Sequence, residues 1–276
     1  MEAIIQVRNL THDYQLSGNE MIRAIEDLSL EIEEGSYVAL VGPNGSGKST
    51  LARHFNAILT PTSGEVMVDG LSTADEQNCW EIRRRVGMVF QNPDNQIVAT
   101  TVEEDVAFGL ENLGVAPELI RRRVAETLDM IGLSSYAQQP PHLLSGGQKQ
   151  KLSIAGIIAM RPRCLVLDEP TAMLDPRGRT EVLGTVKQLN SQEKITVVHI
   201  THFMEEALEA DQVVVLAEGK IVRIGEPQEI FGGELNLEEL GLEVPTVPKL
   251  AHILRQGGLK IPDGVLNMEQ LVNSLC

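Results

Sequence analysis

Positive charge, cysteine and aromatic side chains are all scarce in this sequence of 276 residues. Lys and Arg number 23 against 39 Asp and Glu, and the net charge of −16 argues against a nucleic-acid partner, whose phosphates would be repelled. The three cysteines, Cys79, Cys164 and Cys276, form no CxxC pair. Neither a disulfide framework nor a zinc site is therefore expected, and a reducing cytosol fits this composition.

Long apolar runs are missing as well. None approaches the ~18 residues that a membrane span requires, and the N-terminal sequence MEAIIQVRNL lacks the pattern of a signal peptide. We therefore expect any membrane role to depend on partner subunits. Hydrophobic residues make up 42% of the chain, which is enough for a packed core, and the length fits one large domain with at most a small appendage.

The sequence does contain an alternation of short apolar runs with segments of helical periodicity. The expected strands lie at residues 4–10, 37–42, 65–70, 86–90, 164–170, 196–202 and 212–222. The expected helices cover residues 49–59, 121–132, 147–160 and 179–190. Buried strands that alternate with helices predict an α/β fold with a mainly parallel sheet. We expect an antiparallel β part at the N-terminus, a main domain over residues 1–230 with a helical insert at about 93–161, and a small helical extension over 231–276.

The sequence GPNGSGKST follows the expected strand YVALV and matches the phosphate-binding pattern GxxxxGK[ST], so it predicts a P-loop NTPase core. Glycines allow backbone N–H groups to wrap around a phosphate, and the N-terminus of the next helix adds a positive dipole. Lys48 is expected to neutralise the β- and γ-phosphates of ATP, Ser49 to ligate Mg²⁺ and Thr50 to contact a phosphate. The predicted ATP-binding loop comprises Gly42, Pro43, Asn44, Gly45, Ser46, Gly47, Lys48, Ser49 and Thr50.

A second expected strand, CLVLD, ends in two adjacent carboxylates. Open parallel sheets hold ligands at the carboxyl ends of their strands, so Asp168 is expected to hold Mg²⁺ and Glu169 to act as general base on the attacking water. The pattern alone also fits an ordinary acidic strand end before the turn at Pro170. The phosphate-binding loop upstream favours the catalytic interpretation.

The sequence LSGGQ, at residues 144–148, opens another helix with glycines. Locally it fits a glycine turn capped by Ser145, but one chain does not need a second anion-binding helix end for one phosphate. With this motif the chain resembles the ATP-binding-cassette (ABC) ATPases. The resemblance implies a head-to-tail dimer in which the signature of one subunit completes the ATP site of the other. The ATP contacts expected from the signature are those of Ser145, Gly146, Gly147 and Gln148.

The resemblance implies roles for further residues. Leu174 and Asp175 match the D-loop, and His202 matches the switch histidine that contacts the γ-phosphate. Tyr14 matches the aromatic side chain that stacks on adenine, although a core tyrosine would fit the sequence too. His199, inside an expected strand, is interpreted as a packed histidine rather than a ligand.

The stretch QNPDNQIVATTVEED, at residues 91–105, is rich in turn formers. Gln91 matches the Q-loop glutamine, which in the ABC family reaches Mg²⁺ or the lytic water. QNPDNQ and the later LGLEVPTVPKLAHIL are similar to the ATPases of energy-coupling factor transporters. MLDPRG and VVHITHFMEEA resemble the first of their two paralogous ATPases, so the closer resemblance extends over nearly the whole chain.

This closer resemblance implies a Mg²⁺-dependent ATPase, peripheral at the cytoplasmic face of the cell membrane, that drives import of vitamins or metal ions. It implies ATP and Mg²⁺ as cofactors, and three partners: a second ATPase subunit, a transmembrane coupling subunit and a substrate-binding membrane subunit. The C-terminal extension is expected to support the ATPase dimer. The ATPase of a dedicated cobalt or nickel importer, or of a conventional ABC importer, would share the catalytic residues. The transported solute, and whether the dimer joins identical chains, stay open.

Two kinds of charged cluster have alternative interpretations. Glu103, Glu104 and Asp105 either interact favourably with a helix N-terminus or receive an arginine from the transmembrane subunit. The basic triplets at residues 83–85 and 121–123 are more typical of solvated helix faces than of membrane anchors.

Overall fold

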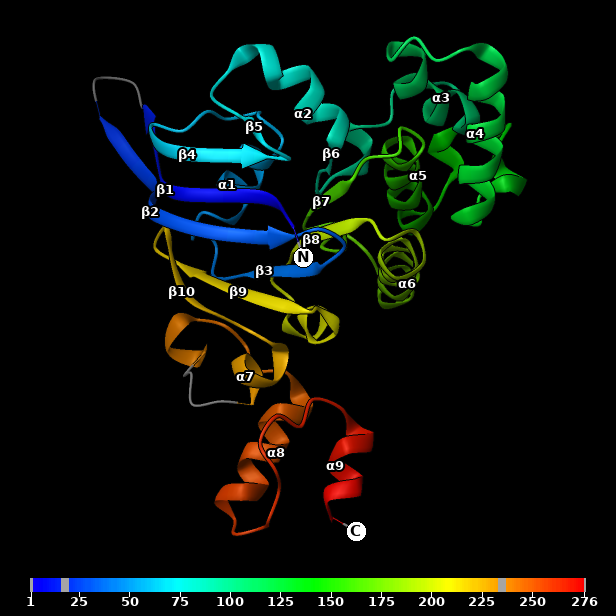
Figure 1. Cartoon of the computed structure of the whole chain (residues 1–276). Coiled ribbons are helices and arrows are strands. Elements are labelled where there is room, and N and C mark those ends of the chain that lie inside the picture. Colours follow the sequence, from blue (N-terminus) through cyan, green and yellow to red (C-terminus); the bar gives the residue numbers. More distant parts are fainter. Residues whose placement is uncertain (1, 16–19, 233–236, 276) are drawn as a thin grey trace.

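The computed structural model describes residues 2–15, 20–232 and 237–275 (Figure 1). The strands are β1 (Ala3–Gln15), β2 (Met21–Glu33), β3 (Tyr37–Val41), β4 (Ser63–Val68), β5 (Leu71–Ser72), β6 (Val86–Val89), β7 (Cys164–Asp168), β8 (Thr196–Ile200), β9 (Gln212–Ala217) and β10 (Lys220–Gly225). The α-helices are α1 (Lys48–Phe55), α2 (Cys79–Arg85), α3 (Val102–Asn112), α4 (Pro117–Met130), α5 (Gly146–Ile158), α6 (Pro176–Glu193), α7 (Pro227–Phe231), α8 (Thr246–Gln256) and α9 (Met268–Leu275). Cys79 and Cys164 are free thiols, whereas Cys276 and part of the expected extension (233–236) lie outside the described residues.

A six-stranded sheet with the order β10-β9-β3-β8-β7-β6 forms the centre of the fold. The strands from β9 to β6 run parallel, and β10 pairs antiparallel with β9 at one edge. Every residue of β3, β6, β7 and β8 is buried, which explains why these strands are mostly apolar. The single strand expected at 212–222 is instead the hairpin β9–β10, because Glu218 and Gly219 both take positive φ and reverse the chain.

Alternating residues of β3 belong to two different hydrophobic layers. Val38 and Leu40 pack with α1 and with the antiparallel sheet β2-β1-β4-β5, which was predicted at the N-terminus. Ala39 and Val41 pack on the opposite side with α6 and the C-terminal part of α5. The central sheet is therefore covered on both faces, as in Figure 1, where α1 lies between the two sheets.

Helices α3, α4 and α5 form the expected helical insert on one side of the sheet (Figure 1). They have a hydrophobic cluster of their own, in which Val106, Leu110, Leu128 and Leu152 are buried. On another side of α5, Ile154 packs in the hydrophobic layer against the central sheet. Through α5, the insert is therefore packed directly against the catalytic core.

The chain continues beyond the sheet into α7, α8 and α9 (Figure 1). Ala251, Ile261, Val265 and Leu271 form a small cluster at the last two helices. The predicted fold class is confirmed, whereas the domain boundary near residue 230 stays a prediction. Within the described ranges, no helix has the length and apolar character needed to cross a membrane.

Candidate nucleotide-binding and catalytic site

The phosphate-binding loop connects β3 to α1, and its shape requires glycine at two positions. Gly42 has φ +156°, and a Cβ atom there would lie 2.2 Å from the carbonyl oxygen of Leu216. Gly47, the N-cap of α1, has φ +100°, and a Cβ atom would lie 2.7 Å from the carbonyl oxygen of Ala24. Side chains are excluded at both positions, so the loop presents backbone to an anion at the start of α1.

Lys48 is folded onto this loop. Its Nζ donates hydrogen bonds to the carbonyl oxygens of Gly42 at 2.8 Å and Pro43 at 3.0 Å, and the residue is 5% exposed. Burial lowers the pKa of Lys48 below its usual value, while the nearby carboxylates of Glu169 and Asp168 oppose that shift. A buried ammonium at a loop of this shape is suited to a multiply charged phosphate group.

Ser49 and Asp168 meet although 119 positions separate them in the sequence. Ser49 Oγ donates a hydrogen bond of 2.8 Å to Asp168 Oδ1. Burial raises the pKa of Asp168 above its usual value, and the hydrogen bond from Ser49 opposes this effect. Hydroxyl and carboxylate oxygens are the ligand types that Mg²⁺ prefers.

Glu169 stands among polar side chains at the carboxyl ends of neighbouring strands. Its Oε2 accepts a hydrogen bond of 3.1 Å from Gln91 Nε2 and lies 3.5 Å from His202 Nδ1. Its φ of +52° is a left-handed conformation that is uncommon for residues with a side chain and that recurs at active sites. The N–H of Glu169 donates to the carbonyl of Ile200, so the neighbouring strand holds this conformation.

Tyr14 is a half-buried residue of β1 beside the phosphate-binding loop. Its hydroxyl lies 3.2 Å from Thr50 Oγ1. The ring of Tyr14 meets His12 edge-on, and His12 meets the buried His54 of α1 in the same manner, with centroids 4.7 and 4.8 Å apart. The location of Tyr14 is compatible with a base-stacking role, because the ring is adjacent to the loop and not enclosed in the core.

The last residue of the segment QNPDNQ, Gln96, hydrogen-bonds back to the backbone that precedes the segment. Gln96 Oε1 accepts the N–H of Phe90 at 2.9 Å, and Gln96 Nε2 donates to the carbonyl of Met88 at 3.4 Å. The side chain of Gln96 therefore bonds to the backbone at the end of β6, from which Gln91 projects. The loop that carries Gln91 is thus anchored at both of its ends.

The signature residues begin α5. Ser145 and Gln148 form a capping box, in which Ser145 Oγ accepts the N–H of Gln148 at 3.3 Å and Ser145 N donates to Gln148 Oε1 at 2.9 Å. Gly147 permits close approach to α6, since a Cβ atom there would lie 3.1 Å from Cα of Gly178. In the part of the chain that the structure describes, no hydrogen bond or ion pair joins residues 145–148 to the phosphate-binding loop. One chain therefore assembles the predicted catalytic group but not the predicted signature contact.

Some side chains that organise this region were not predicted from the sequence. Lys149 Nζ lies 2.7 Å from Asp94 Oδ1 and so links the signature helix to the loop after Gln91. Glu206 is buried near the ends of β7 and β8 and accepts hydrogen bonds from two threonine hydroxyls. The sequence offers only a weak signal for Glu206, since two adjacent glutamates lie between the apolar Met204 and Ala207 and only the structure shows that the second one is buried.

Comparison with known proteins decides the family. The model of the family described as ABC transporter matches residues 25–172. The chain belongs to the ABC transporter family. The energy-coupling factor transporter ATP-binding protein EcfA1 of Clostridioides difficile (strain 630) is 52% identical over 276 residues, which are 100% of this chain and 99% of that protein. The protein of the same name from Caldanaerobacter subterraneus subsp. tengcongensis is also 52% identical over 276 residues, which are 100% of each chain.

Solved structures of ABC proteins share the fold. The structure of cbiO1 from Clostridium perfringens, part of the ABC transporter complex cbiONQ, has a TM-score of 0.79 and 33% identity, covering 92% of this chain and 100% of cbiO1. The dimeric post-hydrolysis state of the ATP-binding cassette MJ0796, bound to ADP and Pi, has a TM-score of 0.73 and 33% identity, covering 81% and 98% of the two chains. The predicted P-loop ATPase fold is therefore confirmed, and the chain is an ABC ATPase of the energy-coupling factor type.

The site of this ABC ATPase fits ATP with Mg²⁺. At its glycines the loop presents only backbone, which suits nucleotide phosphates, and the buried ammonium of Lys48 adds a positive charge. The oxygens of Ser49 and Asp168 fit a hard cation. The side-chain amide of Gln91 can add a third oxygen, because its nitrogen and not its oxygen is hydrogen-bonded to Glu169.

Proposed function

We propose that this ABC ATPase is the ATP-hydrolysing subunit of an energy-coupling factor importer and that Glu169 is its general base. The observation that carries the proposal is the convergence of Gln91 and His202 on one carboxylate oxygen of Glu169, at 3.1 and 3.5 Å. These three side chains come from the ends of three adjacent strands, next to the phosphate-binding loop.

The nucleotide is held by residues of the same sheet edge. Lys48 and the N-terminus of α1 bind the β- and γ-phosphates, and Tyr14 stacks on the adenine. Ser49, Asp168 and Gln91 hold Mg²⁺, which neutralises negative charge on the phosphate oxygens when bound. The residues that bind ATP are thus separate from the carboxylate that acts on water.

The chemistry assigned to Glu169 is proton transfer. Its carboxylate accepts a proton from water as the water oxygen attacks the γ-phosphorus and the bond to ADP breaks. Gln91 orients the carboxylate through its N–H, and His202, beside the same carboxylate, contacts the γ-phosphate. These contacts supply orientation, which accounts for most of the protein's part in phosphoryl transfer.

The ATP site is completed by residues 145–148 of a second ATPase subunit, either an identical chain or a paralogue. The capping box of α5 occupies the side chains of Ser145 and Gln148, whereas the N–H groups of the two glycines between them belong to the first turn and are free to bind an oxyanion. The apolar, half-exposed side chains of Ile253, Met268 and Val272 on α8 and α9 support an additional dimer contact through the C-terminal extension.

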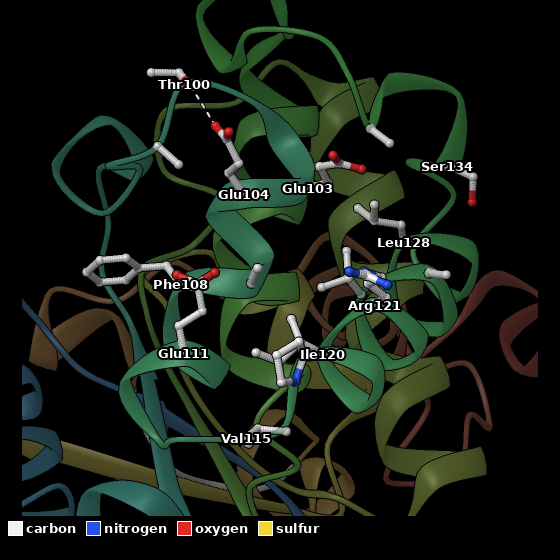
Figure 2. Close-up of a pocket in the computed structure, with 16 residues that line it drawn as sticks. Thr100, Glu103, Glu104, Phe108, Glu111, Val115, Ile120, Arg121, Leu128 and Ser134 are labelled. Atoms are coloured by element: carbon white, nitrogen blue, oxygen red, sulfur yellow. Dashed lines mark hydrogen bonds between the residues drawn. The ribbon is translucent and has the colours of Figure 1, made fainter.

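The groove between α3 and α4 is the proposed docking site for the transmembrane subunit (Figure 2). It has a volume of about 1120 Å³, and the structure separates the roles of the acidic residues that begin α3. Glu104 completes the capping box of α3 and accepts the hydroxyl of Thr100 at 2.6 Å. Asp105 is 8% exposed and accepts two backbone N–H groups of the preceding loop. Among the described residues, Glu103 has no such partner, and it lines the groove.

Glu103 is therefore the carboxylate that we assign to an arginine of the membrane partner. Glu111 lies two turns further along the same helix and also lines the groove. Phe108, which is 49% exposed, lines this groove and also the neighbouring cavity beside Trp80, so it offers an aromatic anchor. A cationic helix end with apolar flanks fits this combination of charge and surface.

The proposed complex includes a substrate-binding membrane subunit, with this chain peripheral at the cytoplasmic face. Its solute is a vitamin or a metal ion, chosen by that other subunit. One alternative is the ATPase of a dedicated cobalt or nickel importer, which the structural similarity to cbiO1 supports. The other is the ATPase of a conventional ABC importer. The higher identity, 52% over the whole chain, to energy-coupling factor ATP-binding proteins supports the first assignment.

The test is purification of the membrane complex through a tag on this chain, followed by identification of the co-eluting proteins and measurement of its ATPase rate. Glu169→Gln should retain ATP binding and lose turnover by about 100-fold or more. Glu193→Gln, at the end of α6, is the matched control. Near-normal turnover of Glu169→Gln would contradict the role of the base, and absence of membrane proteins from the eluate would contradict the transport role.

A further inference from the structure

A buried carboxylate connects the two segments that follow β7 and β8. Glu206 belongs to the short 3-10 helix η5 (Met204–Glu209) and is 8% exposed. Its Oε1 accepts a hydrogen bond of 2.7 Å from Thr171 Oγ1, and its Oε2 accepts one of 2.6 Å from Thr201 Oγ1. Each carboxylate oxygen thus holds a different segment of the chain.

Both threonines are close in sequence to a residue of the proposed reaction. Thr171 follows Glu169 by two positions, and Thr201 directly precedes His202. Thr201 Oγ1 also accepts the backbone N–H of the residue after His202, at 3.0 Å. Through Thr171 and Thr201, the hydrogen bonds of Glu206 therefore hold the two chain segments that carry Glu169 and His202.

The surroundings keep this carboxylate ionised. Burial alone would raise the pKa of Glu206, but His199 and the two threonine hydroxyls outweigh it and hold the pKa below its usual value. His199 is fully buried, which confirms the predicted packed histidine, and its Nε2 lies 3.3 Å from Glu206 Oε2. Burial raises the pKa of Tyr37, so its phenol stays protonated and can donate to His199 Nδ1, which lies 2.9 Å away.

We propose that Glu206 is a positioning residue for ATP hydrolysis, which sets the separation of Glu169 and His202 by holding Thr171 and Thr201 together. The inference rests on the roles proposed above for Glu169 and His202. The two side chains are 3.5 Å apart, and the water and the γ-phosphate must be placed against them. Displacement of a reacting group by ~1 Å can cost about 100-fold in rate, so a small separation of the two segments has a large effect.

Glu206→Ala in the complete membrane complex is the first test. The variant should lower kcat about 10- to 100-fold, as expected for a residue that orients catalytic groups. The KM for ATP should change much less than kcat, because no contact of the phosphate-binding loop is altered. Glu205→Ala changes the exposed neighbour on the same 3-10 helix and serves as the matched control. A rise in KM together with an equal fall in kcat and a lower Tm would indicate a structural role and overturn the inference.

A second pair of variants leaves Glu206 in place, so its result does not depend on whether the protein tolerates the cavity that Glu206→Ala creates. Thr201→Val keeps the branched shape and removes the hydroxyl, whereas Thr201→Ser keeps the hydroxyl. The expected result is a lower kcat for Thr201→Val and substantial recovery for Thr201→Ser. Equal rates for the two would overturn the inference, because the hydrogen bond to Glu206 would then be irrelevant to turnover.

Combination with Glu169→Gln separates the inference from the proposed function. If Glu206 acts through Glu169 and His202, the double variant should lose much less activity than the product of the two single losses. Losses that multiply would overturn the inference. Normal kcat for Glu206→Ala beside an inactive Glu169→Gln would overturn the inference alone, whereas normal kcat for Glu169→Gln would overturn the proposed base and the inference with it.

Discussion

Gln91 Nε2 donates a hydrogen bond of 3.1 Å to Glu169 Oε2, across 78 positions of sequence. Gln91 begins the segment that leads from β6 into the helical insert, whereas Glu169 directly follows strand β7. The same segment is tied to the signature helix by the ion pair of Asp94 with Lys149. A displacement of the insert, at the groove or at the signature, can therefore reach the proposed base through one amide side chain.

The composite site predicts a specific phenotype for Ser145→Arg. In the dimer, the N-terminus of α5 is expected to face the nucleotide bound by the partner subunit. The arginine would fill the space between them, so hydrolysis by the complex should fall by about 100-fold or more. ATP affinity of the separate chain should not change, since in the described residues no polar contact joins the signature to its own phosphate-binding loop. Filter-binding and ATPase assays measure the two quantities.

Loss of the N-cap accompanies this substitution and needs its own control. Removal of such a cap costs about 1 kcal/mol of stability. Ser145→Ala removes the same cap without bulk or charge, so its Tm should match that of Ser145→Arg while it retains more activity. Unchanged hydrolysis by Ser145→Arg in the assembled complex would be incompatible with a head-to-tail dimer.

The sequence was informative where the chemistry allows few residue types. Gly42 and Gly47 occupy positions that exclude a Cβ atom, and Lys48 supplies the positive charge of the pattern, so the loop could be recognised without tertiary information. Continuous apolar runs likewise predicted buried parallel strands. The run 212–222 differs, because Glu218 and Gly219 form a turn inside it and divide the single expected strand into a hairpin.

The remaining features depend on tertiary contacts that a sequence pattern does not encode. Glu103, Glu104 and Asp105 have similar side chains, yet Asp105 is buried, Glu104 lines the groove while capping α3, and Glu103 lines the groove without a partner among the described residues. Only the path of the preceding loop separates these roles. Glu206 and Gln96 act through partners distant in space or at a loop end, and no residue type at those positions was demanded by a motif.

Stability should depend on pH through His54. Burial, and to a smaller extent the neighbouring His12, lowers the pKa of His54 to about 4, whereas the same histidine in the unfolded chain has a pKa of about 6.5. Below about 6.5 the unfolded chain binds a proton that the folded chain does not, so the free energy of unfolding decreases as the pH falls toward about 4. At pH 5 this contribution amounts to about 2 kcal/mol.

Denaturant unfolding at pH 7.5 and pH 5 measures this contribution. His54→Phe keeps an aromatic ring but cannot titrate, so its loss of stability between the two pH values should be about 2 kcal/mol smaller than that of the natural sequence. His142→Phe, at an exposed position, is the control and should leave the difference unchanged. An unaltered pH dependence in His54→Phe would show that this histidine is not responsible.

The apolar face of the C-terminal helices predicts a contribution to dimer affinity. Val272 on α9 is 48% exposed, and Asn273 beside it is exposed and polar. Val272→Asp should weaken self-association or pairing with the paralogue about tenfold or more, because an aspartate in an apolar interface is costly to bury. Asn273→Asp adds the same charge at the adjacent position and should have little effect. Sedimentation velocity measures the change, and equal affinities for the two variants would count against an interface here.

Glu103 predicts how the groove between α3 and α4 recognises its partner. Because Glu104 and Asp105 are engaged in hydrogen bonds within the chain, reversing all three charges would damage α3 itself, whereas Glu103→Lys changes only the carboxylate that lines the groove without a partner. The new lysine would repel an incoming arginine, so the yield of membrane complex and solute uptake should fall about tenfold or more. ATP affinity should stay the same, since the groove is separate from the phosphate-binding loop.

A matched reversal is available in the next helix. Glu118 is exposed in the first turn of α4, so Glu118→Lys opposes a helix dipole to the same extent but does not alter a residue that lines the groove. It should assemble and transport normally in reconstituted vesicles. If both reversals reduce assembly equally, general charge and not the groove determines docking. If Glu103→Lys reduces assembly and an arginine-to-glutamate change in the transmembrane subunit restores it, the restored complex identifies the partner of Glu103 directly.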